Sequence, residues 1–241
     1  MRLDLYLFEN GLCISRTEAK NFIQQGAVKV NGVAVTKPAF EVSGCENIEL
    51  DRSSKRYVSR GGFKLEAALQ AFAASPCGKL CIDIGASSGG FTDCLLQNGA
   101  KRVIALDSGT AQLVDSLRND TRVLCMEKCN ARYLERDDLE FIPNFAVMDV
   151  SFISATLIIP AIYSCLAEGS DFICLVKPQF EVGRAFLGKG GIVKDKKARE
   201  LALKNVVDFA RAAGFDFCGS IISPIEGGDG NIEYLAHFKK N

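Results

Sequence analysis

The chain has 241 residues, with 29 basic and 29 acidic side chains, and this length allows one sizeable core plus a small appended module. Arg2 and Asp4 interrupt any early apolar segment, which argues against a secretory leader and for reduced thiols. The ten cysteines include no Cys-x-x-Cys pair and there is a single histidine, so we expect no metal site.

Positive charge is concentrated near the start of the chain. Residues 1–64 hold ten Lys and Arg against seven Asp and Glu, whereas the remainder holds nineteen against twenty-two. Attraction to phosphate depends on the local field rather than on the net charge. Contacts with nucleic acid are therefore expected in the N-terminal part.

The first fifty residues predict two short helices followed by a hairpin. Amphipathic stretches begin at Arg2 and after Ser15, where apolar residues take helical spacing. Four valines then alternate around Asn31-Gly32, a pair typical of two-residue turns with positive φ. We assign residues 1–51 to a small α+β domain, residues 52–60 to a basic linker and residues 61–241 to a second domain.

The second domain alternates strand-like runs with helical segments, which predicts a doubly wound, Rossmann-like α/β sheet. A helical stripe follows Leu65. The uncharged stretch 150–167 reaches the lower length limit of a membrane helix, but its serines and Pro160 favour a strand end leading into a buried helix. The predicted strands are residues 80–84, 102–107, 122–126, 145–150, 171–176, 217–222 and 232–238.

A glycine turn follows the first of these strands, and Asp107 ends the next one. Small residues after a buried strand let the backbone approach a ligand, and a carboxylate on the neighbouring strand can accept both ribose hydroxyls. The two strand ends therefore predict a cofactor that contains adenosine. The candidate cofactor-binding residues are Asp83, Gly85, Ser87, Gly89, Gly90, Phe91, Asp107 and Asp149.

The turn by itself leaves three interpretations open. A dinucleotide fingerprint requires glycine where Ser87 stands, because that glycine lets the chain approach a pyrophosphate. S-adenosylmethionine has no phosphate and tolerates the serine, which favours a methyltransferase over a nicotinamide enzyme. Residues 85–89 also match the nucleophile elbow of serine hydrolases, with His237 as the partner. The strand context of His237 argues against a triad and for an ordinary, partly exposed histidine.

Charged residues at strand ends are the candidates for chemistry, since ligands of open α/β sheets lie beyond the carboxyl ends of the strands. Asp149 and Lys177 each close an apolar run. Glu233 begins the final run, and Lys64 lies at the start of the second domain's first helix.

The segments around these four residues, 59–65, 149–154, 176–181 and 230–234, resemble the TlyA (haemolysin A) family. The catalytic domain of that family is similar to the FtsJ/RrmJ ribose 2'-O-methyltransferases. The resemblance implies a catalytic tetrad of Lys64, Asp149, Lys177 and Glu233. It also implies S-adenosylmethionine as the cofactor and a ribosomal RNA ribose, with cytidine expected, as the substrate.

The N-terminal domain resembles the small RNA-binding domain first recognised in a protein of the small ribosomal subunit. Residues 2–4, 15–16 and 26–32 carry this resemblance. It implies binding to ribosomal RNA or ribosomal subunits through shape and phosphate contacts. The candidate RNA contacts, which include one in the glycine-rich segment 183–193, are Arg2, Arg16, Lys20, Lys29, Lys37, Arg56, Arg60 and Arg184.

Ribose methylation needs in-line positioning and removal of the hydroxyl proton. We choose Lys177 as the base, because desolvation and the Lys64 ammonium would favour its neutral form, provided that no carboxylate lies too close. The alternative is that both lysines stabilise the developing alkoxide.

Two rival functions are a non-catalytic RNA-binding or ribosome-assembly protein and, following the family's name, a membrane-active haemolysin. The chain offers no convincing membrane span and no long basic amphipathic helix. We expect a cytoplasmic enzyme with no obligate protein partner.

Overall fold

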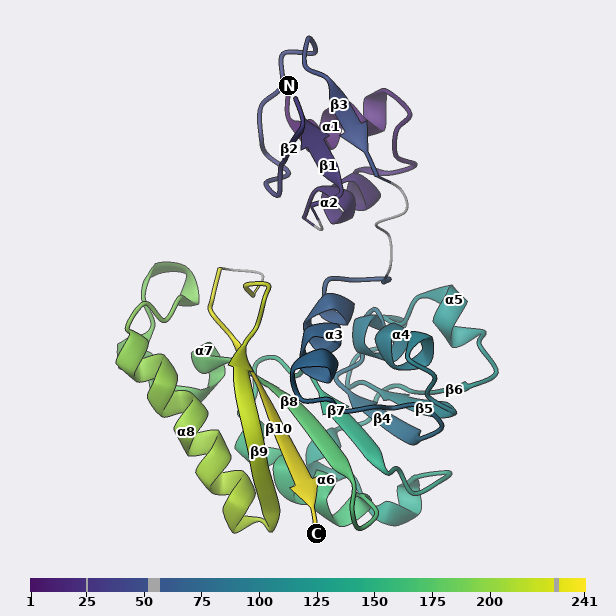
Figure 1. The fold of residues 1–241 in the computed structure, drawn as a ribbon, viewed down its shortest axis with the longest axis vertical. Helices are drawn as coiled ribbons and strands as arrows, with labels where there is room; N and C mark the ends of the chain where they lie inside the picture. The colour runs from purple at the N-terminus through teal and green to yellow at the C-terminus, as the bar shows by residue number, and fades with distance from the viewer. Residues whose placement is uncertain (25, 52–56, 228–229) are drawn as a thin grey trace. The chain divides into compact units, whose positions relative to one another are not determined.

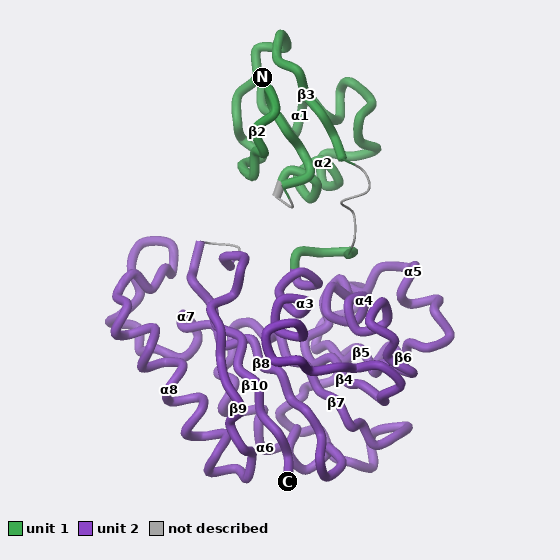
Figure 2. Tube along the Cα trace, viewed as in Figure 1, with its two compact units in different colours: residues 1–60 green, residues 61–241 purple. Residues whose placement is uncertain are grey.

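The computed structural model describes the chain except for residue 25, residues 52–56 and residues 228–229 (Figure 1). The chain divides into two compact units, Met1–Arg60 and Gly61–Asn241 (Figure 2). Most of the predicted linker, including Arg56, lies outside the described residues, so the boundary at residue 51 remains a prediction.

The N-terminal unit has the two predicted helices and the predicted hairpin. Asn31 and Gly32 have φ of 51° and 79°, as a tight two-residue turn requires. A third strand, not predicted, pairs with the first and completes a sheet of order β2-β1-β3. The elements are α1 (Leu3–Glu9), α2 (Arg16–Gln24), β1 (Val28–Val30), β2 (Val33–Ala34) and β3 (Ile48–Leu50).

The second unit is built on a seven-stranded sheet of order β6-β5-β4-β7-β8-β10-β9. The strands from β6 to β8 are parallel, and β10 runs antiparallel to both of its neighbours. The α/β prediction and all seven predicted strands are confirmed. The strands are β4 (Leu80–Ile84), β5 (Arg102–Leu106), β6 (Val123–Met126), β7 (Phe145–Met148), β8 (Asp171–Val176), β9 (Phe215–Ile222) and β10 (Tyr234–Lys240).

Helices cover both faces of this sheet (Figure 1). The helices α3 (Gly61–Ala71) and α4 (Gly90–Gln97) pack against each other on one face. The other face is covered by α6 (Ile159–Cys165), which forms within the uncharged stretch, and by α8 (Lys196–Ala212). Two one-turn helices, α5 (Asp115–Arg118) and α7 (Pro178–Glu181), lie in loops. None of the helices in the described part of the chain is long and apolar enough to cross a membrane.

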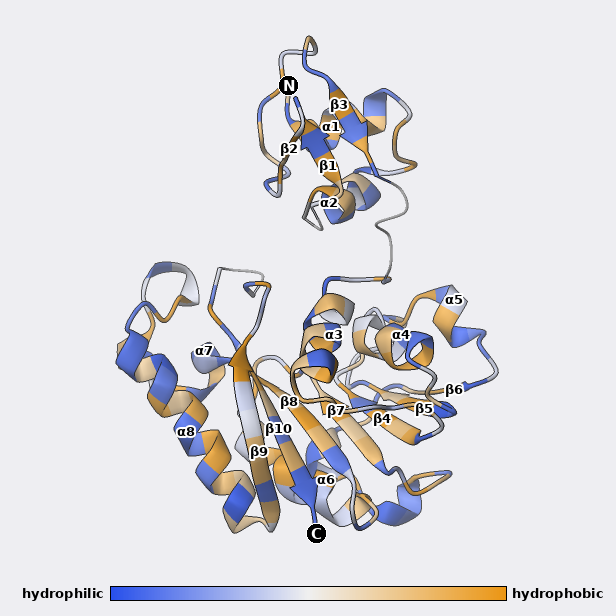
Figure 3. Cartoon of the chain, in the orientation of Figure 1, coloured by the Kyte–Doolittle hydropathy of each residue, from blue (hydrophilic) through white to orange (hydrophobic). Residues whose placement is uncertain are grey.

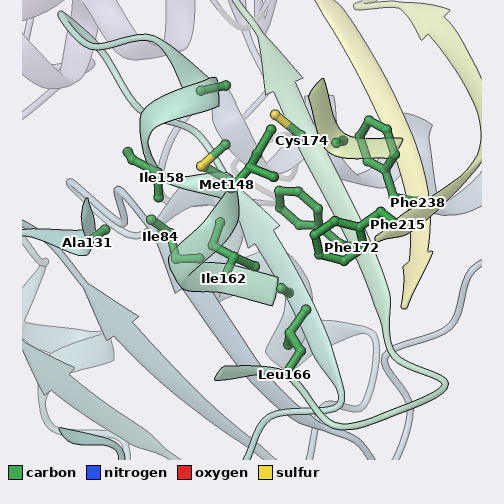
Figure 4. Packing of buried hydrophobic residues seen from close by; sticks show 14 of the residues in the cluster. Ile84, Ala131, Met148, Ile158, Ile162, Leu166, Phe172, Cys174, Phe215 and Phe238 are labelled. Carbon is green, nitrogen blue, oxygen red and sulfur yellow. The ribbon is translucent and has the colours of Figure 1, made fainter. Parts of the chain in front are cut away.

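A large core cluster lies between the sheet and the helices α6 and α8 (Figure 4). Side chains alternate along a strand, so Ile82 and Ile84 of β4 face this cluster together with Phe172 of β8. Figure 3 shows the apolar colour concentrated on the central strands. Full burial of a side chain such as Phe172 contributes about 2 kcal/mol.

The strand order reverses between β4 and β7, because the chain fills one side of the sheet with β5 and β6 and the other with β7 and β8. At such a reversal the loops leaving the two strands diverge and open a crevice at their carboxyl ends. The topology therefore sets the place of the site.

Candidate active site

A cleft of about 480 Å³ opens at this reversal. Its volume lies within the range of about 300–1,000 Å³ that is usual for small-molecule sites. The residues that line it follow the ends of β4 to β7 and are Ile84, Gly85, Ser87, Leu106, Asp107, Ser108, Gln112, Cys129, Asn130, Ala131, Asp149, Val150, Ser151, Phe152, Ile153 and Ile158.

The glycine turn after β4 forms one wall of the cleft. Gly85 has φ of +83°, and a Cβ at this position would collide with the carbonyl oxygen of Asp149. A residue with a side chain would therefore push apart the ends of β4 and β7. Ser87 also adopts positive φ, at 48°, and lines the cleft.

Asp107 joins the glycine turn to the end of β5. Its two carboxylate oxygens accept hydrogen bonds from the backbone N–H groups of Ser87, at 2.8 Å, and Gly109, at 2.7 Å. The carboxylate is thereby fixed at the cleft. Each oxygen keeps a second lone pair that could accept a ribose hydroxyl.

The structure separates the eight candidate cofactor residues into two groups. Gly85, Ser87, Asp107 and Asp149 line the cleft. The others lie outside the cleft lining, in β4 and at the start of α4 on either side of the turn; they are Asp83, Gly89, Gly90 and Phe91.

Asp83 is fully buried below the turn, where the Thr92 hydroxyl donates a 2.6 Å hydrogen bond to it. Burial raises the pKa of Asp83 to about 7, against the effect of this hydrogen bond. Its Oδ1 has no hydrogen-bond partner among the described residues. Gly89 caps α4 with φ of 97°, and the space where its Cβ would stand is filled by Leu113 and Leu117.

The cleft residues that the sequence analysis did not propose include Gln112, Asn130 and Phe152. They lie in loops, where periodicity gives no signal. Phe152 falls within a segment that carried the family resemblance, yet its backbone φ of 65° and its 92% exposure could only be seen in the structure. Such a φ is rare for a bulky residue and marks backbone strain.

Lys64 and Glu233 form a buried ion pair although they are far apart in the chain. Nζ of Lys64 donates to Oε2 of Glu233 at 2.5 Å, and the two side chains are 9% and 2% exposed. A Cβ on Gly227 would collide with the same carboxylate. The backbone at Gly227 is therefore packed closely against Glu233.

Lys177 and Asp149 form the second pair, at the ends of β8 and β7. Nζ of Lys177 lies 2.6 Å from Oδ1 of Asp149, at ion-pair distance but without hydrogen-bond geometry. It donates a hydrogen bond of 2.8 Å to the Ser151 hydroxyl. The pair is more accessible than the first one, with side-chain exposures of 12% and 23%.

Strand pairing brings the two ion pairs to the same edge of the sheet. Val176 of β8 is in register with Tyr234 of β10, so Lys177 and Glu233 stand next to each other in the ladder, one residue beyond its end. The adjacent β7 contributes Asp149. Two lysines and two carboxylates thus lie along one edge of the sheet, at the carboxyl ends of β7 and β8, the amino end of the antiparallel β10 and the start of α3.

The loops around these pairs are cross-linked. Glu181 of α7 accepts hydrogen bonds from the Ser154 hydroxyl, at 2.6 Å, and from the Ala155 N–H, at 2.8 Å. Burial raises the pKa of Glu181. The carboxylate therefore ties the segment that follows Asp149 to the segment that follows Lys177. The rings of Phe152 in the first segment and Phe180 in the second are also in contact, with centroids 5.3 Å apart.

Asn231 provides a similar link two residues before Glu233. Its buried side-chain amide accepts from the Val193 N–H at 2.9 Å and donates to the Gly191 carbonyl at 3.1 Å. These bonds attach the end of the glycine-rich segment 183–193 to the site. Arg184, in the same segment, is exposed.

The candidate RNA contacts of the N-terminal unit fall into two kinds. Lys20, Lys29 and Lys37 are exposed. Arg2 and Arg16 are 48% exposed, but both guanidinium groups bind the fully buried Asp4, at 3.0 and 3.2 Å. Hydrogen bonding from Arg2 is the main cause that lowers the pKa of Asp4, against its burial.

Of the remaining candidates, Arg60 is partly buried at the end of the N-terminal unit. Arg56 lies outside the described residues. The RNA-binding role of every candidate stays a prediction.

The hydrolase interpretation fails, and so does the expectation of a partly exposed histidine. His237 is only 5% exposed, and it pairs with Ile173 inside the sheet, away from the strand ends that carry Ser87. Its Nε2 lies 2.9 Å from Asp171. Among the described residues no group of three His, Cys, Asp or Glu could hold a metal ion.

Comparison with known proteins places this site in a family. The sequence profile of the FtsJ-like methyltransferases matches residues 57–240, and the S4 domain profile matches residues 1–48. The fold and the site thus define a methyltransferase joined to an S4 domain.

The similarity to relatives extends over nearly the whole chain. "Hemolysin A" of Brachyspira hyodysenteriae is 48% identical over 99% of both chains. "16S/23S rRNA (cytidine-2'-O)-methyltransferase TlyA" of Mycobacterium tuberculosis is 42% identical over 97% of this chain and 88% of that protein. The chain belongs to the TlyA (haemolysin A) family of FtsJ-like methyltransferases, and its methyl donor is S-adenosylmethionine.

Solved structures agree with this assignment. A structure from Streptococcus thermophilus, described as a hemolysin, has 47% identity and a TM-score of 0.79, and the match covers 100% of this chain and 88% of that one. An S-adenosylmethionine-dependent methyltransferase from Mesorhizobium loti has 15% identity and a TM-score of 0.55, over 73% of this chain and 98% of that one. The second similarity shows the fold alone.

Proposed function

We propose that this protein transfers a methyl group from S-adenosylmethionine to a ribose 2'-hydroxyl of ribosomal RNA, with cytidine as the target nucleoside, in the cytoplasm. The observation that carries the proposal is the Lys177–Asp149 contact at the ends of β8 and β7, where Asp149 also lines the cleft, with the Lys64–Glu233 pair at the adjoining start of β10. Relatives with this whole-chain architecture carry names that specify cytidine 2'-O-methylation of ribosomal RNA.

The cleft fits the proposed cofactor. The glycine turn leaves backbone space at one wall, Asp107 presents fixed carboxylate oxygens suited to a ribose, and Asp149 supplies negative charge to a cation. S-adenosylmethionine, when bound, supplies an electrophilic methyl group on a positively charged sulfur.

Lys177 remains the proposed acceptor of the hydroxyl proton, although Asp149 lies 2.6 Å from its Nζ and the condition that no carboxylate lies close is therefore not met. The contact with Asp149 stabilises the Lys177 ammonium. Because Asp149 also lines the cleft, the same carboxylate would face both Lys177 and a cation bound there. With a neutral Lys177, the methyl group would pass to the ribose oxygen and the hydroxyl proton to Lys177, so the net charge of the site would be conserved.

Lys64 holds a second positive charge near the reaction and Glu233 neutralises most of it. The deep burial of this pair makes it a fixed element rather than a mobile one. Its proposed roles are to orient the ribose and to stabilise the alkoxide as it develops.

Sequence-specific RNA recognition usually targets single-stranded loops, whose unpaired bases can stack on aromatic side chains. Phe152 presents an exposed aromatic face at the cleft, on a backbone that the Glu181 link holds in place. Exposed aromatic rings of this kind stack on unpaired bases. The S4 domain supplies additional RNA contacts in the proposal.

The test is transfer of labelled methyl from S-adenosylmethionine to purified ribosomal subunits, followed by mapping of 2'-O-methylated riboses. The proposal predicts label at a discrete cytidine and none with Lys177→Ala. Binding of RNA without transfer would instead support an RNA-binding or assembly protein. Label on a base rather than a ribose would refute the proposed reaction.

A further inference from the structure

Glu127 stands directly after β6 and binds three donors of one loop. Its carboxylate accepts the backbone N–H groups of Ala111 at 2.9 Å and Gln112 at 3.1 Å, and the Arg118 guanidinium at 2.6 Å. The Glu127 side chain is only 14% exposed. One carboxylate therefore fixes both ends of the segment 111–118.

This segment forms the rim of the cleft on the Asp107 side. Gln112 lines the cleft together with Asp107 and Ser108, and its side chain lies against Gly109, where a Cβ would collide with it. Gly109 is also the residue whose N–H bonds to Asp107. The position of Gln112 and that of the ribose-binding carboxylate are therefore linked.

The same segment rests on the glycine turn. Leu113 and Leu117 occupy the space that Gly89 leaves open, and the Val114 N–H bonds to the Ser88 carbonyl at 3.4 Å. Displacement of the segment would thus disturb two walls of the cleft at once. Glu127 itself is outside the cleft lining.

From this arrangement we infer that Glu127 is a positioning residue for cofactor affinity, which acts by holding the segment 111–118 over the adenosine side of the cleft. The inference rests on the proposed function, since it assumes that S-adenosylmethionine occupies the cleft. Charged acceptors bind N–H donors more strongly than neutral ones. Hydrogen bonding from Arg118, followed by that from Ala111, lowers the pKa of Glu127 to about 2, so the acceptor remains charged at physiological pH.

Loss of the Glu127 contacts should affect the rim of the cleft and leave the rest of the second unit intact. The segment lies at the edge of the sheet, and its helix α5 has four residues. Loss of the Glu127 contacts should therefore loosen the rim without disturbing the tetrad, which lies at the ends of β7, β8 and β10 and at the start of α3. Cofactor affinity should change while the chemical step stays intact.

The experiment is isothermal titration of the full chain with S-adenosylmethionine and S-adenosylhomocysteine, compared for wild type and Glu127→Gln. The amide places a donor against the donors of the segment, so we expect both Kd values to rise about tenfold. With saturating cofactor, kcat and the KM for RNA should stay within twofold of wild type. Arg118→Ala, which spares the two backbone bonds, should raise Kd by about threefold.

Glu140→Gln is the matched control, because Glu140 accepts from Arg102 at 2.8 Å close to the start of β5, outside the cleft lining. It should leave Kd unchanged. The inference is overturned if Glu127→Gln binds both ligands as tightly as wild type. It is also overturned if Glu127→Gln lowers kcat at saturating cofactor together with the melting temperature, because a merely structural role would have that effect. Failure of the wild type to bind either ligand would instead reject the proposed function.

Discussion

Both ends of the central strands carry ion pairs. At the carboxyl ends, Lys177 meets Asp149 beside the cleft. At the amino ends, Asp171 accepts hydrogen bonds from Lys79 at 2.6 Å and binds Nε2 of His237 at 2.9 Å. Aromatic rings cover this second cluster: Phe72 stacks on His237 with centroids 5.2 Å apart, and Phe145 lies 5.0 Å from the Lys79 ammonium.

The difference shows that buried charge alone does not identify an active site. The amino-end cluster joins β8 and β10 to the start of β4 and satisfies its charges within the fold. The Lys177–Asp149 pair lies next to the point where strand order reverses, and Asp149 lines the cleft. Access and topology, rather than burial, distinguish the catalytic candidates.

The largest expected effect separates the two ends by their role in transfer. Lys177→Ala should lower methyl transfer by about a thousandfold, since it removes the proposed base, while cofactor binding remains. Lys79→Ala, at the other end, should stay within about threefold of wild type when assayed well below its melting temperature. Transfer of labelled methyl measures both. Equal losses would remove the distinction between the two ends.

The second effect concerns stability. Asp171→Asn should lower the free energy of unfolding by about 3 kcal/mol, because it breaks a buried pair with two partners. Urea denaturation measures this loss, and the activity of the folded variant should remain close to that of wild type. A stable but inactive variant would assign a catalytic role to the amino-end cluster.

The third effect compares two glycines that flank β4, Gly85 at its carboxyl end and Gly78 at its amino end. Gly85→Ala should weaken cofactor binding by about thirtyfold, equivalent to about 2 kcal/mol of strain, because the new Cβ meets the Asp149 carbonyl. Gly78→Ala is the control: Gly78 also has positive φ, +71°, but nothing lies within 4 Å of its Cβ position. It should lower stability without changing affinity, as measured by titration calorimetry.

The fourth effect is a dependence on pH. Burial opposes the shift, but hydrogen bonds from His237 and Lys79 lower the pKa of Asp171 from its ordinary value of 3.8 to about 2. A lowered carboxyl pKa stabilises the folded state above the ordinary value, and this stabilisation disappears as pH falls through the folded pKa. Wild type should therefore lose stability between pH 4 and pH 2 more steeply than Asp171→Asn in thermal melts.

The smallest effect lies in the N-terminal unit, where Arg16 is paired with Asp4 and Lys29 is exposed. Lys29→Ala should weaken RNA binding by a few-fold and reduce the salt dependence of log K by about one phosphate contact. Arg16→Ala should in addition lower the melting temperature. Binding titrations over a range of salt concentrations measure the first effect. No change in slope would assign Lys29 to solvated surface.

The sequence predicted the strands well because each is a continuous apolar run between polar loops. The strand β3 was missed because its three residues, Ile48–Leu50, are too few to show a period. The strand β10 extends two residues beyond its prediction, to Lys240, whose ammonium donates to the Tyr163 and Leu166 carbonyls. Two consecutive lysines at the end of an apolar run give no sequence signal that the strand continues.

The sequence predicted some residues of the site and missed others. The four tetrad candidates came from a family resemblance, and the contact of Lys64 with Glu233 depends on tertiary structure that periodicity does not encode. Asp83 lies in a run that is apolar on both faces, so alternation could not show that it points to Thr92 rather than to the cleft. The roles of Gln112 and Glu127 depend on loop geometry and left no pattern in the sequence.

The strand β10 lies between β8 and β9, although β9 is made before it during synthesis. Until β10 emerges from the ribosome, β9 has no neighbour in the sheet, and the carboxylate partner of Lys64 has not been made. Completion of the fold and completion of the tetrad are thus one event. A nascent or prematurely terminated chain could already present its glycine turn, yet it would lack Glu233, one of the four residues of the proposed tetrad.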